Sequence, residues 1–180
     1  MKNNKKSFRK SKAWIAKSFF ITLFISALFA TLSNGILPIA PTWISILLIL
    51  VFVLLGVGAD TIAVAVAIAS PIPFNSMSSR RVRGGKTAVW LVQNSDKVAN
   101  ITGDIIGDIC AIISGGAVAI LVDGLTTFTI PMPAMMIGVA SFISALTVGL
   151  KAAGKSFAIK NANRITFNVA LFISAFRRER

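Results

Sequence analysis

Long apolar runs dominate this chain, and its polar positions gather in the segments between them. Four runs, at about residues 14–32, 43–70, 98–122 and 130–150, are long enough to cross a membrane. Each supplies roughly the 20 residues that a helix needs to span a hydrocarbon core about 30 Å thick. Prolines lie at the edges of these runs, where a missing backbone N–H costs little: Pro38, Pro41, Pro131 and Pro133. The pattern predicts an all-α, polytopic membrane protein.

Two further segments predict helices that lie at the membrane surface. Residues 71–97 form a basic loop whose short apolar patch, Thr87 to Val92, includes Trp90, and tryptophan favours the headgroup level. Residues 161–176 carry apolar side chains at helical spacing, namely Ile165, Val169, Phe172 and Phe176, opposite a polar side made by Asn161, Arg164, Asn168 and the terminal RRER. This pattern predicts an amphipathic helix on the inner leaflet. A fifth span is the alternative, although its apolar stretch is short.

Charge gives the orientation and limits the class of partner. Only 14% of residues are charged, against about 25% in a soluble domain, yet the net charge is +13. All 19 Lys and Arg fall within residues 1–17, 71–97 and 151–180, which lie on one side of a four-span arrangement. The positive-inside rule therefore predicts a multi-pass plasma-membrane protein with both termini in the cytoplasm. The basic residues are expected to face anionic lipid headgroups rather than nucleic acid.

The first apolar run has a second interpretation. A basic stretch, an apolar run and small residues at 27–30 are also typical of a cleaved signal peptide, which would leave three spans. Its length and the lysine at position 17 favour an uncleaved span. The predicted organisation is a basic tail with an extra span at 1–42, a membrane domain at 43–176 and a short basic tail at 177–180.

Three aspartates lie inside the apolar runs. Asp60, Asp104 and Asp108 are half of the six acidic residues. A charged side chain at the centre of a membrane helix costs about 2.5–3.5 kcal/mol on insertion scales, so such residues usually line an ion path or pair with each other. At about 1.5 Å per residue, Asp60 and Asp104 are expected at a similar depth in the inner half of the membrane. Asp104 and Asp108 are four residues apart and share a helix face.

Neighbouring side chains and glycine extend this set of oxygen ligands. Asn100 precedes the aspartate pair on the same stripe, and Thr61, Thr102 and Gly103 lie beside the acidic positions. Such oxygens suit hard cations, above all Mg²⁺. They do not decide whether Co²⁺ is also carried. The chain has no His and a single cysteine, Cys110, which excludes an internal disulfide and a Cys/His zinc cluster. The alternative is that the aspartates share protons or bond to neighbouring helices.

A stripe of small residues runs beside the aspartates. Gly103, Gly107, Ala111 and Gly115 recur every four residues in the third run. Small residues at this spacing let membrane helices approach closely, so the stripe predicts tight packing or self-association on this face.

Three stretches resemble the membrane domain of the cyclin M/CorC magnesium-transporter family. They are GADTIAVAV, RGGKTAVWLVQNSDKVANITGDIIGDI and GKSFAIKNANRITFNVALFI, within about residues 55–176. The resemblance implies a homodimer of three core helices with a juxtamembrane belt and an ion site between the first two core helices. By motif, Asp60 stands where the family has glutamate. Asp104 and Asp108 stand where it has two asparagines, with Gly103 before the first.

The chain also departs from the family pattern. Lys151 stands near a family glutamate, and Gly154 replaces a proline. The Lys151 ammonium is long enough to neutralise a nearby carboxylate, but at the inner interface it is expected to extend to water. No counterpart of the family's paired nucleotide-sensing CBS module is expected after the amphipathic helix, so ATP-linked regulation is expected to need a separate partner.

Two classes of function therefore remain. One is a divalent-cation transporter that works as a dimer through Asp60, Asp104 and Asp108. The other is a non-transporting membrane subunit or regulator. No nucleophile with a base, phosphate loop or metal-hydrolase motif is found, so an enzyme is not expected.

Overall fold

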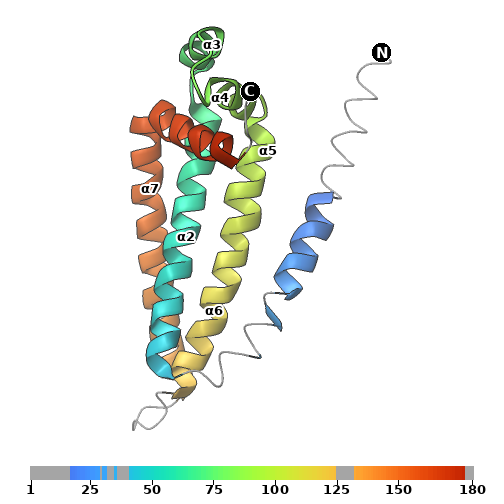
Figure 1. Ribbon diagram of the computed structural model, residues 1–180. Helices are drawn as coiled ribbons and strands as arrows, with labels where there is room; N and C mark the ends of the chain where they lie inside the picture. The colour runs from blue at the N-terminus through green and yellow to red at the C-terminus, as the bar shows by residue number, and fades with distance from the viewer. Residues whose placement is uncertain (1–16, 29, 32–34, 36–40, 125–131, 177–180) are drawn as a thin grey trace, which may run out of the picture.

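Three long helices form the body of the protein. The computed structural model describes residues 17–28, 30–31, 35, 41–124 and 132–176, which are helical almost throughout and contain no strand. Helix α2 (Thr42–Ile68), the continuous helical stretch Ser95–Gly124 and the first part of α7 (Met132–Phe176) are each long and apolar enough to cross a membrane. They lie side by side in Figure 1. The prediction of a helical fold is confirmed, and three of the predicted spans correspond to helices with the length and composition that a span requires.

Helix α2 is the centre of the bundle, because it packs against both of the other long helices. In the N-terminal half of α2, the buried side chains of Ile49 and Val53 pack against α6 (Gly107–Gly124). Their partners there are Ala117, Val118 and Leu121. Exposed leucines and isoleucines cover the outside of the bundle, which in water would be unfavourable. Surfaces of this kind fit a lipid environment, where apolar side chains face the acyl chains and small residues face neighbouring helices.

The predicted first span is described only in part. The described helix, Lys17–Leu28, is shorter than the length that a span requires, and the rest of the predicted run at 14–32 lies mostly outside the described residues. The Ser18 hydroxyl donates a hydrogen bond of 3.0 Å to Asn100 Oδ1, which ties the start of this helix to the start of the third run.

Two short helices form the belt predicted at 71–97. They are α3 (Pro71–Ser79) and α4 (Gly85–Gln93), and both lie at the end of the bundle where α2 ends (Figure 1). Gly84 joins them with φ of 81°, a left-handed conformation that glycine adopts without a steric cost. Phe74 and Leu91 are buried in the belt core, whereas Trp90 is 52% exposed on its outside. The sequence therefore predicts correctly that a short helix surrounds Trp90.

Helix α7 bends at Asn161, whose φ and ψ of −122° and 24° are not helical. Figure 1 shows that the part after the bend turns across the belt end of the bundle. The predicted amphipathic helix 161–176 is thus a separate arm. Small residues form its buried side, namely Ala158, Thr166, Ala170 and Ser174, the first of them just before the bend. Of its predicted apolar stripe, Phe172 and Phe176 are 68% and 81% exposed.

Candidate functional site

Asp60 lies inside the bundle with both carboxylate oxygens near neighbouring helices. Its side chain is 18% exposed. Oδ2 lies 3.6 Å from Lys155 Nζ of α7, in an ion pair. Oδ1 faces the third run, because a Cβ placed on Gly103 would lie 3.5 Å from it. Because Gly103 has no side chain, the Asp60 carboxylate lies close to the backbone of the neighbouring helix.

The helix opposite Asp60 is not a regular α-helix. Between α5 (Ser95–Ala99) and α6, residues Asn100–Ile106 form a π-helical segment, η2. Wider turns of this kind are rare and occur often at functional sites, where they shift the positions of side chains and backbone groups. Segment η2 carries four of the seven predicted ligands: Asn100, Thr102, Gly103 and Asp104.

Polar side chains of η2 pair along one face. Asn100 Nδ2 donates a hydrogen bond of 2.9 Å to Asp104 Oδ2, while Asn100 Oδ1 accepts one from Ser18. These bonds fix the Asn100 amide and hold the Asp104 carboxylate along the helix. The Asp104 side chain nevertheless remains exposed at the surface of the single chain, as does Asp108 one turn further on.

The two predicted threonine ligands are bonded to their own helices. Thr61 Oγ1 donates to the carbonyl of Val57 at 2.7 Å, and Thr102 Oγ1 donates to that of Val98 at 2.8 Å. Each hydroxyl keeps its acceptor lone pairs, so it can still present oxygen to a cation. Thr61 also lies against α7, since a Cβ on Gly154 would be 2.5 Å from its hydroxyl oxygen.

Apart from Thr102, the predicted residues therefore fall into two groups. Asp60, Thr61 and Gly103 meet where α2 contacts η2 and α7, and Asn100, Asp104 and Asp108 line an exposed face. Within the described parts of the chain, no three acidic, histidine or cysteine side chains gather closely enough to hold a metal ion. One chain thus supplies the carboxylate oxygens of Asp60 and Asp104 on adjacent helices but no closed coordination cage.

Sequence reasoning missed Lys155 as a member of this site. It considered only Lys151 for a neutralising role and expected its ammonium to extend to water instead. Lys151 is one turn earlier on α7 and lines a pocket of about 370 Å³ between α2, α6 and α7. Lys155 does belong to the GKS stretch that carries the family resemblance.

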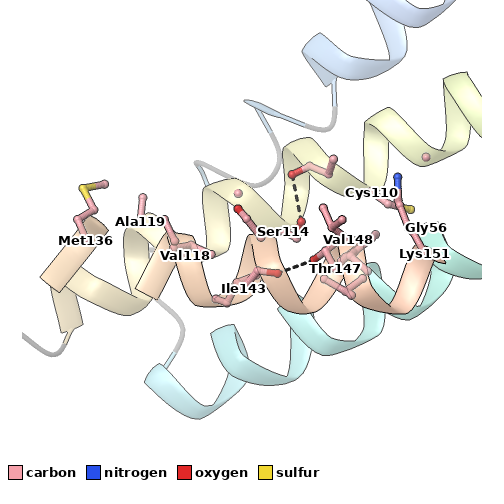
Figure 2. A pocket seen from close by; sticks show the side chains of 17 residues that line it. Gly56, Cys110, Ser114, Val118, Ala119, Met136, Ile143, Thr147, Val148 and Lys151 are labelled. Atoms are coloured by element: carbon pink, nitrogen blue, oxygen red, sulfur yellow. Dashed lines mark hydrogen bonds between the residues drawn. The ribbon is translucent and has the colours of Figure 1, made fainter. Parts of the chain in front are cut away.

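The pocket beside Lys151 has the wrong chemistry for a cation. Figure 2 shows Lys151 and Cys110 at one end and mostly apolar side chains along the rest. The Ser114 and Thr147 hydroxyls donate to carbonyls of their own helices, those of Ala111 and Ile143. A space with a lysine at its end and no carboxylate on its wall repels rather than binds a metal ion.

Comparison of the chain with protein-family models, with curated proteins and with solved structures finds no match. Geometry and sequence pattern therefore carry the functional argument.

Proposed function

We propose that this protein transports a divalent cation, Mg²⁺ above all, across the membrane through a site between its core helices. The observation that carries the proposal is the placement of Asp60, a largely buried carboxylate in an apolar span, against the π-helical segment that bears Asn100 and Asp104. Carboxylate, amide and backbone oxygens are the ligands that Mg²⁺ prefers, and it commonly retains several waters. The resemblance to the cyclin M/CorC family points to the same ion.

A second copy of the chain completes the proposed site. Asp104 and Asp108 are exposed on one face of the third helix, and a bare carboxylate against lipid is costly. Ala111 and Gly115, which are also exposed, continue this face at helical spacing and permit close approach of another helix. A homodimer through this face would cover the aspartates and bring further oxygens to the ion. A multi-pass plasma-membrane location, with both termini and the belt in the cytoplasm, belongs to this proposal.

Reconstituted vesicles with a Mg²⁺-sensitive dye test the proposal directly. Wild-type protein is expected to carry Mg²⁺ in at least one orientation. Asp104→Asn, which keeps the shape but removes the charge, is expected to lower flux at least about tenfold, the equivalent of losing about 1.4 kcal/mol of interaction. Asp96→Asn is the matched control, because Asp96 is exposed at the start of the helix, outside the site.

A non-transporting membrane subunit or regulator is the second candidate. The ion pair between Asp60 and Lys155 favours it, since an ammonium group already neutralises the carboxylate without any metal. Absence of Mg²⁺ flux in both orientations, from protein that remains helical and monodisperse, would support this candidate and overturn the transport proposal. A separate membrane or cytoplasmic partner would then be sought by crosslinking in the native membrane.

A further inference from the structure

Lys155 holds the position that a cation bound to Asp60 would need. Its ammonium nitrogen is 3.6 Å from Asp60 Oδ2, a contact at ion-pair distance on the carboxylate edge that faces α7. The two side chains differ in exposure, at 52% for Lys155 and 18% for Asp60. The carboxylate is therefore fixed inside the bundle, whereas the lysine reaches it from the outside.

Close packing of α7 on α2 brings the lysine to this place. Gly154 has no side chain, and the space of its missing Cβ is filled by the Thr61 hydroxyl and by Val57, one helical turn earlier. The next residue along α7 is Lys155, so the glycine contact sets the level at which the ammonium meets Asp60. The pairing is thus a consequence of helix packing rather than of a chance surface encounter.

The same lysine has a second favourable environment. It lies six residues before the bend at Asn161, about 9 Å along the helix from the polar end of the bundle. Lysine side chains near helix ends extend along the helix to place their charge in water. The side chain is already half exposed, so it can leave Asp60 without being left unpaired in an apolar interior.

We propose that Lys155 is a tethered competitor of the transported cation, which neutralises Asp60 in the empty site and is displaced by a divalent ion. This inference rests on the proposed transport function and assigns its selectivity. A free monovalent cation brings no more charge to Asp60 than the Lys155 ammonium does. It must also compete with that ammonium, which the chain holds beside Asp60 at an effective concentration of about millimolar or more. A divalent ion brings twice the charge to the same carboxylate. Lys155 therefore excludes monovalent cations and admits divalent ones.

Binding measurements on the purified, full-length protein test this assignment. Mg²⁺ affinity is measured by titration calorimetry in lipid nanodiscs, at low and at high KCl. Lys155→Met is expected to raise the Mg²⁺ affinity at least about tenfold and to make it sensitive to KCl. Lys155→Arg should behave as the wild type. Lys151→Met is the matched control, because Lys151 lies one turn away on the same helix and lines the pocket instead of contacting Asp60.

A second readout uses the unmutated chain and so does not depend on the folding of a variant. An amine-reactive label followed by mass spectrometry reports the accessibility of each lysine. Added Mg²⁺ is expected to increase labelling of Lys155 and to leave that of Lys151 unchanged. Labelling of Lys155 that stays constant at saturating Mg²⁺ would overturn the displacement.

The outcomes separate this inference from the transport proposal. If wild-type protein carries Mg²⁺ but Lys155→Met leaves affinity and KCl dependence unchanged, the inference is wrong and transport stands. If only Lys155→Met binds Mg²⁺ and the wild type neither binds nor carries it, the lysine is a permanent block and the transport proposal is wrong. Should no variant bind Mg²⁺, both are overturned.

Discussion

Asparagine in place of Asp60 is expected to reduce Mg²⁺ flux about a hundredfold or more, while the helical fold is kept. Asparagine has nearly the same shape, so packing against Gly103 is preserved. The change removes the negative charge that a divalent ion needs at the buried end of the site. Loss of one partner of a buried charged contact costs about 2–5 kcal/mol, and every 1.4 kcal/mol corresponds to a factor of ten. The measurement is initial flux into dye-loaded vesicles at matched protein density.

The structure also predicts how this variant folds. Lys155 loses its partner, but it is half exposed and can turn toward the polar end, so the thermal midpoint is expected to fall only slightly. The double variant Asp60→Asn, Lys155→Met removes both charges and should unfold close to the wild type while remaining inactive. Flux that survives in Asp60→Asn at the wild-type level would show that the carboxylate does not contact the ion.

Much of the fold was within reach of the sequence, because apolar runs and helix breakers report directly on membrane spans. The second run was predicted at 43–70 and is helical over Thr42–Ile68. The third was predicted at 98–122 and lies within the helical stretch Ser95–Gly124. The arm was predicted to begin at residue 161, where a polar side starts, and α7 bends at Asn161. In each case a change of local composition marks the boundary.

The packed side of the arm is less easy to infer from hydrophobicity. In a water-soluble protein, large apolar side chains such as Phe172 and Phe176 would be expected to face the protein interior. Here both rings are exposed and contact each other, with their centroids 5.2 Å apart. Thr166 and Ala170 are buried instead. Near a membrane, large apolar side chains gain nothing by avoiding lipid, and small residues allow helices to approach. The predicted amphipathic helix turns its apolar side toward lipid, but the sequence pattern does not identify the small residues that pack against the bundle.

Two features of the candidate site depend on tertiary contacts and leave no local signature. The NITGDII stretch carries polar residues that mark a site, but nothing in it specifies π-helical hydrogen bonding over Asn100–Ile106. Lys151 and Lys155 are one turn apart on α7, so the sequence cannot decide which of them meets Asp60. The contact of Gly154 with Thr61 fixes the position of α7 along α2. It thereby places Lys155, rather than Lys151, beside Asp60.

Alanine at position 154 is therefore expected to destabilise the bundle and to separate Lys155 from Asp60. The new Cβ would lie 2.5 Å from Thr61 Oγ1 and 3.2 Å from Val57 Cγ1. The threonine cannot easily move, because its side chain is β-branched and its hydroxyl is bonded to the Val57 carbonyl at 2.7 Å. Overpacking of this kind typically costs about 1–3 kcal/mol. Thermal unfolding in detergent, followed by circular dichroism, measures the loss.

Gly149→Ala provides the matched control, because it makes the same change on the same helix at a glycine with no atom within 4 Å of the added methyl group. Alanine favours a helix over glycine by up to about 1 kcal/mol, so this variant should unfold at the wild-type temperature or above it. Thr61→Ala combined with Gly154→Ala removes the obstructing hydroxyl and should restore most of the lost stability. Equal unfolding temperatures for the two single glycine variants would mean that α7 does not contact α2 at Gly154, and the placement of Lys155 beside Asp60 would lose its structural basis.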